Sequence, residues 1–583
     1  MPHHHKRRVR ALPFTTRHSY LTVIIAAITQ LFQWNWDSVA AECTAFIGPA
    51  GYGFVQVSPP QEHITGAEWS SNYSPVSYNL VSKFGNRDQF ANMVSTCHAA
   101  GVSVIADAVW NHMSSFAGTG IGGTVFTKYV YTGTYQTQDF HHAQCGTSDE
   151  QPRTYQSLVA PGFLANESSV KDNYANRTEV QDCELDNLAD LATETEWVRS
   201  RLAAYANDLI SLGVDGFRND AAMWIPASDL ANISTRLTKQ VYRTQEVSWG
   251  SGNAIQPQEY IGTGDVQEFR YTWALQTAFN TGTISTLNSL PQSGWLAPSN
   301  ANVFVANHDT ERGGDSLNYS SPNNAYTLAM MFSLSYPYGT PTILSSYQYS
   351  TITDGAPNAN YGYCSGNGGA GGWLCQHRWT PISGMVGFYN KVSGTTLNNW
   401  VSGTGAQIAF GRGSVGFIVI NSGGSPWSKT FTTSLLTGTY CNLFDGNLTS
   451  GACTGSSVFV ASGGALAVTV PAYSALAIYT GAIGNPSNVL VIFEATASTV
   501  SGENIYVVGS ISQLGAWSPQ SGIALGASAY PLWTASVSLP PNTAFTYKYV
   551  RKEANGTFVW ESDPNRSFTT GVSGLVSTAD LWR

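Results

Sequence analysis

Between about residues 28 and 387, short apolar runs alternate with segments of helical periodicity. The run GYGFVQVSPP around Phe54 and the run GVSVIADAVWNH predict strands that end in polar residues. Residues 196–212 carry apolar side chains at helical spacing, and another strand-like run, GVDGFRND, follows them. Repeated strand–helix–strand order requires parallel pairing and predicts an α/β fold. In a barrel of this kind, polar residues at the C-terminal ends of the strands line the active face.

The chain needs several domains, because 583 residues are too many for one core. We expect the barrel at 28–388. The alternation stops between His112 and Cys183, where Gly, Thr, Tyr and Gln dominate, and this predicts a functional insertion at about 113–185. Later in the chain helical periodicity gives way to short strands with turn signals. They predict an all-β domain, a linker and a second β domain, at 389–481, 482–488 and 489–583.

The composition suits a neutral, hydroxyl-covered ligand. Charged residues make up only 11% of the chain, while it contains 17 Trp and 29 Tyr. A β-rich protein with ordinary core aromatics would have a similar composition. The net charge of −9 argues against nucleic acid, which needs clustered Lys and Arg. A membrane role is also excluded, because no stretch reaches the roughly 18–20 apolar residues that span a bilayer.

Cysteine usage and glycosylation sequons favour an oxidising, extracellular location. Eight cysteines allow about 105 pairings, so sequence alone leaves the connectivity open: Cys43, Cys97, Cys145, Cys183, Cys364, Cys375, Cys441 and Cys453. Asn-x-Ser/Thr sequons occur at Asn72, Asn166, Asn176, Asn232, Asn318, Asn447, Asn555 and Asn565. A basic region ending near Arg17 and the apolar run Tyr20–Ala27 make residues 1–27 similar to a short, atypical signal peptide. We expect a secreted monomer.

Four carboxylates occupy predicted strand ends, in DAVWNH, GFRNDA, QEVSWG and NHDTER: Asp107, Asp220, Glu246 and Asp309. Any one of them alone is more often a helix cap or a surface charge. Cleaving a glycosidic bond needs one protonated carboxyl for the leaving oxygen and one ionised carboxylate to attack or activate water. Arg218 lies two residues before Asp220 and hence on the same strand face, where we expect it to keep Asp220 ionised.

These motifs resemble the four signature regions of α-amylases in glycoside hydrolase family 13. The segments LFQWNWDSVAAEC, VQVSPPQEHI, YSPVSYNL and NHDTERGGD are most similar to the animal and actinobacterial type. The resemblance runs from about Ile28 to Tyr479. It implies a (β/α)8 TIM barrel with an inserted domain B and an all-β domain C. By position it implies that Asp220 is the nucleophile, Glu246 the general acid/base and Asp309 a third carboxylate that holds sugar hydroxyls.

The resemblance also implies substrate contacts near the cleavage point at Trp69, Tyr73, His112, Arg218 and His308, with Tyr73 stacking beneath the sugar. It implies a structural Ca²⁺ bound by the side chains of Asn111 and Asp190 and the carbonyls of Gln181 and Trp224, since oxygen donors suit this hard cation. The implied disulfides are Cys43–Cys97, Cys145–Cys183, Cys364–Cys375 and Cys441–Cys453.

Several positions depart from the family pattern. Asn219 stands where an aliphatic residue is usual, and Ala306 replaces a frequent Asp. Met223-Trp224 replaces a common Lys-His pair, which puts sugar binding beyond the cleavage point in doubt. Animal enzymes bind chloride through Arg, Asn and a second Arg. Arg218 and Asn307 match the first two, but the third position is Thr342, so chloride is not expected.

The last 95 residues resemble a starch-binding domain of carbohydrate-binding module family 20, in ENIYVVGSISQLGAW, PLWTASVSLP, YKYVRKE and VWESDPNR. By position the resemblance implies one stacking platform, three hydroxyl-bonding residues and a second aromatic site: Trp517 and Trp560; Lys548, Glu561 and Asn565; Tyr506 and Tyr530. Two rings at a fixed angle can grip a curved α-glucan. Trp533 lies in an alternating strand pattern and is expected in the core.

We therefore expect a secreted retaining α-amylase that hydrolyses internal α-1,4 bonds of starch and related α-glucans. One alternative is a maltooligosaccharide-forming hydrolase or transglycosylase of the same family, which would share the catalytic trio and differ in acceptor-side loops. Another is a starch-binding protein with an inactive barrel, against which the three retained carboxylates argue.

Overall fold

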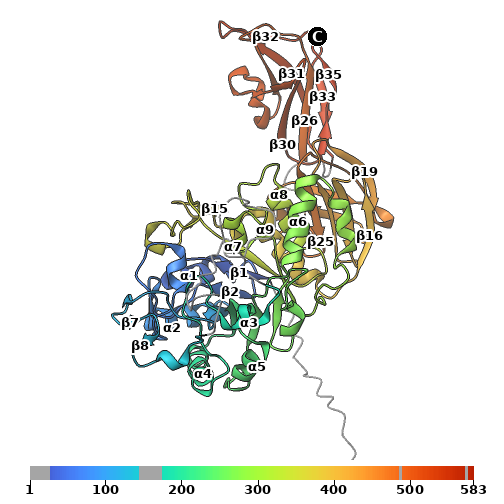
Figure 1. Ribbon diagram of the computed structural model, residues 1–583. Coiled ribbons are helices and arrows are strands. Elements are labelled where there is room, and N and C mark those ends of the chain that lie inside the picture. The colour runs from blue at the N-terminus through green and yellow to red at the C-terminus, as the bar shows by residue number, and fades with distance from the viewer. Residues whose placement is uncertain (1–26, 143–173, 485–488, 572–574) are drawn as a thin grey trace, which may run out of the picture.

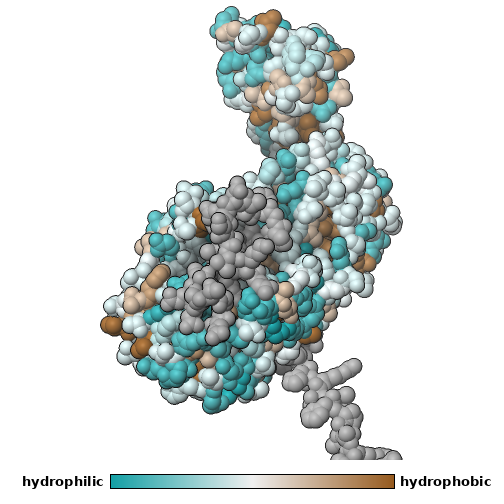
Figure 2. All heavy atoms as spheres, viewed as in Figure 1, coloured by the Kyte–Doolittle hydropathy of each residue, from teal (hydrophilic) through white to brown (hydrophobic). Residues whose placement is uncertain are grey.

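A computed structural model describes residues 27–142, 174–484, 489–571 and 575–583. The expected signal-like segment, apart from its last residue, and residues 485–488 of the expected linker lie outside the described residues. Figure 1 shows three bodies in sequence: a barrel with its helices, a β domain beside it, and a second β domain that extends away from the barrel. On the face shown in Figure 2, the described hydrophobic residues form small separated patches.

Eight parallel strands close into a barrel in the order β1-β13-β12-β11-β10-β9-β5-β2, which confirms the predicted α/β barrel. The short apolar runs form these strands because their side chains are buried on both faces of a parallel sheet. The strands are β1 (Ile28–Leu31), β2 (Phe54–Val57), β5 (Ser103–Val109), β9 (Gly216–Asp220), β10 (Tyr242–Gln245), β11 (Asp265–Gln267), β12 (Ala301–Phe304) and β13 (Thr340–Ser345).

Helices cover the outside of the barrel (Figure 1). α2 begins in a capping box, in which Asn86 and Gln89 each bond the other's backbone N–H. α4 begins at the N-cap Thr195 and buries Val198, Leu202 and Leu209 at helical spacing. The helices are α1 (Trp36–Glu42), α2 (Arg87–Ala99), α4 (Glu196–Ser211), α5 (Ala227–Thr235), α6 (Phe269–Thr281), α7 (His308–Gly313), α8 (Ala325–Ser333) and α9 (Thr380–Val392).

The segment after β5 leaves the barrel pattern. It forms a small sheet of β6 (Gly118–Thr119), β7 (Val125–Thr127) and β8 (Val130–Tyr131), and further on the helix α3 (Arg177–Asp182). Glu62 holds this sheet to the loop after β2, because one carboxylate oxygen accepts the backbone N–H groups of Gly122 and Thr124 at 2.9 and 3.1 Å. The middle of the expected insertion, residues 143–173, lies outside the described residues. The boundaries of the insertion stay a prediction.

The first β domain contains the four-stranded sheet β16-β17-β18-β25 and a separate core around Phe417, Phe431 and Leu466. Its sheet strands are β16 (Leu397–Ser402), β17 (Gln407–Arg412), β18 (Gly416–Asn421) and β25 (Ser474–Tyr479). The shorter pairs are β19 (Trp427–Thr432) with β24 (Ala465–Val470), β20 (Gly438–Cys441) with β23 (Ser457–Val460), and β21 (Leu448–Thr449) with β22 (Ala452–Cys453).

The second β domain is a sandwich of two five-stranded sheets around its own core. Alternate residues of β26, including Val491 and Phe493, point into this core, and Trp533 is 5% exposed within it, as expected. One sheet contains β26 (Val489–Thr496), β29 (Gly526–Ala529), β30 (Leu532–Leu539), β34 (Leu575–Ser577) and β35 (Asp580–Leu581). The other contains β27 (Asn504–Gly509), β28 (Ile523–Ala524), β31 (Ala544–Lys552), β32 (Phe558–Trp560) and β33 (Arg566–Thr569).

Three of the expected disulfides are present: Cys43–Cys97, Cys364–Cys375 and Cys441–Cys453. Cys183 is also disulfide-bonded, and its expected partner Cys145 lies outside the described residues. Among the helices described, none has the length and apolar character needed to cross a membrane.

Candidate active site

The four strand-end carboxylates meet at the C-terminal face of the barrel. Asp107 lies in β5, Asp220 ends β9, Glu246 follows β10, and Asp309 is the second residue of α7, which follows β12. Parallel strands place all their carboxyl ends at one face, so residues far apart in the chain become neighbours there. The repeated strand-end position of these residues thus produces one cluster of acids.

Arg218 connects this acidic cluster and is only 1% exposed. Its Nη1 donates to Oδ1 and Oδ2 of Asp107 at 2.9 and 3.0 Å and to Oδ1 of Asp220 at 2.7 Å. Its Nη2 lies 2.9 Å from Oε2 of Glu246 and 3.9 Å from Oδ2 of Asp309. One guanidinium therefore neutralises part of the charge of four carboxylates.

Burial raises the pKa of both Asp220 and Glu246, and Arg218 opposes this rise without cancelling it. Burial likewise raises the pKa of Asp107 to about 6. Arg218 opposes the effect of burial at Asp220, but one guanidinium serves four acids and the pKa of Asp220 stays above its ordinary value, so the ionised nucleophile stays a prediction. With all four ionised, the cluster would carry a net charge of −3 in a buried site, so protonation of at least one carboxyl is favoured. The site can thus hold a proton for acid catalysis.

Both expected histidines are buried and neutral at pH 7. Burial lowers the pKa of His112 to about 4, and its Nε2 lies 3.0 Å from the carbonyl oxygen of Tyr73. Burial and the neighbouring cations Arg218 and Arg312 bring the pKa of His308 well below its usual value. The Nδ1 of His308 lies 3.1 Å from Nε2 of Gln30, and its Nε2 lies 3.3 Å from Oδ1 of Asp309. Each ring is therefore held in one orientation beside the acids.

The two expected aromatic residues form a wall beside the cluster. Tyr73 donates its hydroxyl to Oδ2 of Asp107 at 2.8 Å, and its ring stacks on His308 at 5.4 Å between centroids. Trp69 packs edge-on against Tyr73 at 5.7 Å. Trp69 and Tyr73 are 7% and 9% exposed, so only their edges or small parts of their faces are open. The structure thus brings together all eight residues expected at the site.

Sequence reasoning missed Arg312, which stacks on the aromatic wall. Its guanidinium carbon lies 4.6 to 5.7 Å from the centroids of four rings: Phe32, Trp69, Tyr347 and Tyr349. The arginine also donates from Nη1 to the carbonyl oxygen of His308 at 3.3 Å. The sequence could have indicated Arg312, because it lies three residues after Asp309 in a short helix and residues at this spacing share a helix face. Arg312 therefore links Trp69 and His308.

Two of the departures from the family pattern are fully buried. Met223 is 0% exposed, and its backbone N–H donates to the carbonyl oxygen of Glu246 at 3.1 Å. Asn219 pairs with Gln245 in the sheet, on the opposite strand face from Arg218 and Asp220. Asn219 is therefore directed away from the acids, while Met223 helps to place Glu246 through its backbone.

The residues expected to bind calcium form two pairs, Asn111 with Asp190, and the elements that carry Gln181 and Trp224. Asn111 and Asp190 are each 1% exposed, and Nδ2 of Asn111 donates to Oδ1 of Asp190 at 3.1 Å. His141 Nδ1 lies 2.7 Å from the other oxygen of Asp190, so this carboxylate has one cationic neighbour. Gln181 belongs to α3, which packs against the short 3-10 turn that ends at Trp224. Buried carboxylate, amide and carbonyl oxygens at the join of insertion and barrel fit a Ca²⁺ ion.

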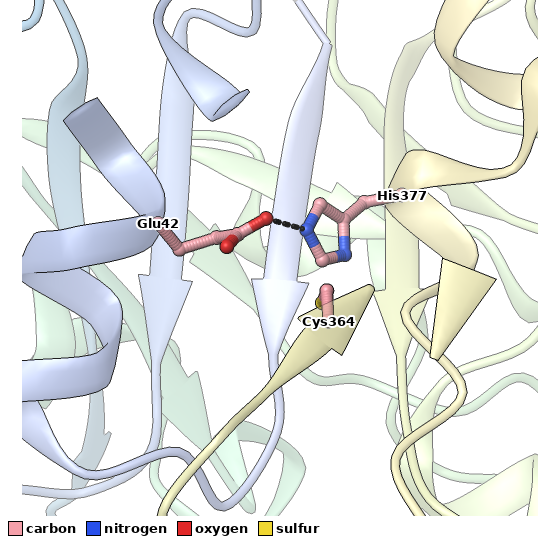
Figure 3. A group of neighbouring side chains, drawn as sticks. All are labelled: Glu42, Cys364 and His377. Carbon is pink, nitrogen blue, oxygen red and sulfur yellow. Dashed lines mark hydrogen bonds and ion pairs between the residues drawn. The ribbon is translucent and has the colours of Figure 1, made fainter. Parts of the chain in front are cut away.

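A second group of potential ligands, Glu42, Cys364 and His377, does not fit a metal (Figure 3). The sulfur of Cys364 is bonded to Cys375 and cannot act as a thiolate. Burial alone would raise the pKa of Glu42, but hydrogen bonds from His377 and Arg378, at 2.7 and 2.6 Å, outweigh it and lower the pKa to about 2. This group is an ion-pair cluster that ties α1 to the segment after β13.

The third position of the chloride pattern contains a bonded threonine. Oγ1 of Thr342 accepts from Nδ2 of Asn302 at 2.9 Å. Asn307 caps α7, where its Oδ1 accepts the backbone N–H groups of Asp309 and Thr310. Thr342 supplies no cation here, and the expected independence from chloride stays a prediction.

In the second β domain, the two expected platform rings are neighbours. Trp517 and Trp560 lie 6.1 Å apart between centroids at an interplanar angle of 43°, and Trp560 is 40% exposed. Asn565 is exposed nearby in the chain, after β32. Lys548 is 7% exposed and its Nζ lies 2.6 Å from Oδ1 of Asp563. The two rings are therefore tilted against each other, and the ring of Trp560 is open to solvent.

The other expected sugar-binding residues of this domain are arranged differently. Glu561 is 2% exposed, and its carboxylate accepts from the backbone N–H of Tyr549 and from Arg566 at 2.8 to 2.9 Å. A sugar contact by the Glu561 carboxylate is therefore not supported, because internal bonds occupy both oxygens. Tyr530 is 54% exposed, whereas Tyr506 of β27 packs against Phe558 of β32 within the same sheet.

Three family descriptions match the chain. The description "Alpha amylase, catalytic domain" matches residues 58–261, "Alpha amylase, C-terminal all-beta domain" matches 400–481, and "Starch binding domain" matches 488–580. The matched parts lie in the barrel, of which they cover residues 58–261, in the first β domain and in the sandwich.

Curated relatives are similar over nearly the whole chain. The alpha-amylase of Streptomyces violaceus is 43% identical over 95% of this chain and 93% of the relative, and that of Thermomonospora curvata is 39% identical over the same shares. Among solved structures, alpha-amylase I from Eisenia fetida matches with a TM-score of 0.69 and 32% identity, over 78% of this chain and 97% of that one. A mutant of the Eisenia protein was crystallised in complex with maltohexaose.

Proposed function

Because this chain belongs to the α-amylase family of glycoside hydrolases and also contains a starch-binding domain, we propose that it hydrolyses internal α-1,4 bonds of starch with retention of configuration. The observation that carries the proposal is the Arg218 cluster, which joins Asp220, Glu246 and Asp309 at the barrel face. The maltohexaose complex of the Eisenia relative supports an α-glucan as substrate.

In the first step Asp220 attacks the anomeric carbon while Glu246 gives a proton to the leaving glycosidic oxygen. A covalent glycosyl-enzyme forms, and the shortened glucan leaves. Glu246 then removes a proton from water, which attacks the anomeric carbon and releases Asp220. Burial raises the pKa of both acids, which supports a proton on Glu246 before the first step, and Nη1 of Arg218 at 2.7 Å stabilises the negative charge that Asp220 needs in order to attack.

Asp309 and the neutral histidines would orient the sugar. Asp309 and His308 lie 3.3 Å apart and present an acceptor and a ring nitrogen to neighbouring hydroxyls. The sugar ring flattens as the transition state of glycosidic cleavage forms. Hydrogen bonds from these residues that become stronger during this flattening lower the activation barrier, because only interactions stronger in the transition state than in the bound substrate accelerate the step. Tyr73 closes the site from below and is fixed by its bond to Asp107.

Two substitutions test these roles: Asp220→Asn and Glu246→Gln. Each should lower kcat on soluble starch by at least about 10²-fold, because such roles normally carry that much. Asp208→Asn, which changes an exposed acid on α4, is the matched control and should retain parental activity. A variant that kept more than a tenth of parental kcat would contradict the role assigned to that residue. Proton NMR of fresh products should show the α-anomer, and the β-anomer would contradict retention.

Endo-action is tested by following viscosity and reducing ends together. Internal cleavage lowers viscosity well before many reducing ends appear, whereas an exo-acting enzyme does the reverse. A transglycosylase is the alternative to test. The buried Met223 stands where the family usually has a lysine that binds sugar on the acceptor side, so acceptor binding differs here. Accumulation of products longer than a maltoheptaose substrate would favour that alternative.

We assign a Ca²⁺ ion to Asn111, Asp190 and the carbonyls of Gln181 and Trp224. When bound, the ion would tie the insertion to the barrel and supply no step of the chemistry. Oxygen donors and burial support this assignment. The disulfides and sequons support a secreted protein, since disulfides persist in oxidising compartments.

The starch-binding domain would hold the enzyme near insoluble starch. Trp517 and Trp560 offer two tilted rings to a curved glucan, and the exposed Asn565 is free to bond its hydroxyls. Once the tethered domain has bound the granule, the barrel meets starch in an intramolecular step. This raises the effective substrate concentration at the barrel.

A further inference from the structure

Two exposed tyrosines flank a buried glycine in the loop between β13 and β14 (Cys364–Ser365). Tyr361 and Tyr363 are 55% and 54% exposed, whereas Trp34 beneath them is 1% exposed. A Cβ atom on Gly362 would lie 2.1 Å from the ring of Trp34, so only glycine fits here. The backbone of this loop therefore lies directly on the Trp34 ring.

This contact fixes the direction of the two tyrosines. Tyr361 has extended backbone, with φ −74° and ψ 98°, and β14 starts one residue after Tyr363. In an extended segment, alternate side chains point to the same side. Because the Gly362 position faces Trp34, both flanking rings face outward. We call Tyr361, Gly362 and Tyr363 the tyrosine platform.

The tyrosine platform is anchored at both ends. The Nδ2 of Asn360 donates to the carbonyl oxygen of Gln33 at 3.0 Å, and the carbonyl oxygen of Asn360 accepts from the backbone N–H of Asn35 at 2.8 Å. On the other side, the Cys364–Cys375 disulfide closes the loop. The backbone that carries the two rings is thus fixed before any ligand arrives, which reduces the entropy lost on binding.

The tyrosine platform belongs to the same rim of the barrel as Trp69. Trp69 donates from Nε1 to the carbonyl oxygen of Ile352 at 2.8 Å, and a Cβ on Gly355 would lie 1.8 Å from the carbonyl oxygen of Ala67. The loop after β13 and the loop bearing Trp69 are therefore in direct contact. In Figure 1 the segment with β15 (Gly368–Gly369) lies at the edge of the barrel beside α1.

The chemistry around the tyrosine platform favours a neutral, hydroxyl-rich ligand. Residues 355–376 contain no Asp, Glu, Lys or Arg, but contain Asn, Ser, Gly and Tyr. A loop without charged side chains of its own offers little attraction to acidic or basic peptides, nucleic acids or lipid headgroups. Tyrosine rings combine a flat apolar face with a polar edge, which suits a sugar ring.

We propose that the tyrosine platform binds the part of a long α-glucan chain that extends beyond Trp69. This inference rests on the proposed function, since it takes the same glucan as substrate. A short maltooligosaccharide would fill the cleft without reaching the platform, whereas amylose would use both. The platform would therefore raise the apparent affinity for long chains alone.

The test compares substrates of two lengths. Tyr361→Ala with Tyr363→Ala is made in the full-length chain that also carries Trp560→Ala, so that the starch-binding domain does not mask the effect. The value of kcat/KM on amylose should fall about three- to tenfold, mainly through KM, since stacking of one or two rings carries that much. On maltotetraose it should stay within about twofold of the parent.

Two control variants sharpen the comparison. Tyr361→Phe with Tyr363→Phe retains the ring faces and should keep most of the amylose activity. Trp197→Ala removes another ring that is 49% exposed, on α4, and should leave both substrates unaffected.

Unchanged kcat/KM on amylose in the alanine variant, with a native circular dichroism spectrum, would overturn the proposal. An equal loss on both substrates would also overturn it, because it would indicate damage to the cleft. A parent chain that hydrolysed neither substrate would refute the proposed function instead. In that case, retardation in an amylose-containing gel would still report whether the tyrosines bind the glucan.

Discussion

Removing Arg218 should destabilise the protein in a pH-dependent way. The substitution Arg218→Met keeps the aliphatic stem but leaves Asp107, Asp220, Glu246 and Asp309 without their shared cation. Breaking a buried ion pair by removing one partner typically costs about 3–5 kcal/mol. At roughly 2–4 °C per kcal/mol, the thermal midpoint at pH 8 should fall by roughly 6–20 °C.

The sign of the pH dependence follows from the acids. Even with Arg218 present, burial raises the pKa of Asp107 to about 6 from an ordinary 3.8. A carboxyl whose pKa is higher in the folded state favours folding below its unfolded pKa and loses this contribution as pH rises through its folded pKa. Without Arg218 the folded pKa rises further. The stability gap between parent and variant should therefore be small near pH 4 and grow beyond pH 6.

Differential scanning calorimetry of both proteins at several pH values measures this gap. Arg87→Met is a matched control, because Arg87 forms an exposed ion pair with Asp208 at 2.5 Å and is 46% exposed. Exposed pairs contribute about 0–1 kcal/mol, so this control should shift the midpoint little at any pH. If Arg218→Met lowered the midpoint equally at pH 5 and pH 8, lost packing would explain the effect and the charge argument would be refuted.

Four further predictions follow from the site and the sandwich. Excess chelator should lower the thermal midpoint, because an ion bound at Asn111 and Asp190 stabilises only the folded state, and an unchanged melting curve would count against that ion. Added chloride should leave kcat unchanged, since Thr342 supplies no cation; several-fold activation in a chloride titration would contradict this. Trp560→Ala should weaken adsorption to raw starch granules by about tenfold while leaving hydrolysis of soluble maltooligosaccharides unchanged. Equal adsorption of variant and parent would contradict glucan binding by Trp517 and Trp560. Arg312→Met should raise KM several-fold with a smaller change in kcat, because Trp69 loses its cationic neighbour; steady-state kinetics with an unchanged KM would show that the stacking does not position Trp69.

Local sequence patterns were enough to predict the barrel and its acids. Apolar runs that end in polar residues predicted β5 and β9, and the carboxylates at their ends met at one face because all barrel strands are parallel. The alternating pattern around Trp533 likewise predicted that this ring lies in a core. Such features depend on neighbours within a few residues, which the sequence displays directly.

Other properties depend on which distant residues meet. Arg218 and Asp220 are two positions apart, yet the pKa of Asp220 depends on Asp107, Glu246 and Asp309 from three other strands or loops. The spacing of Arg218 and Asp220 alone therefore cannot give the protonation state of Asp220. Glu561 was expected to face a sugar, but the fold directs its carboxylate to Arg566 and a backbone amide.

Periodicity, strand ends and family motifs in the chain settled the order of elements and the chemical groups available to the site. Barrel closure and strand register decided how many acids share one guanidinium. The packing of loops and of the sandwich decided that Gly362 lies on Trp34 with a tyrosine exposed on either side, and how far Trp560 tilts from Trp517. The physical reason is that charge interactions, ring geometry and burial depend on distances between atoms remote in the chain, and only packing determines those distances.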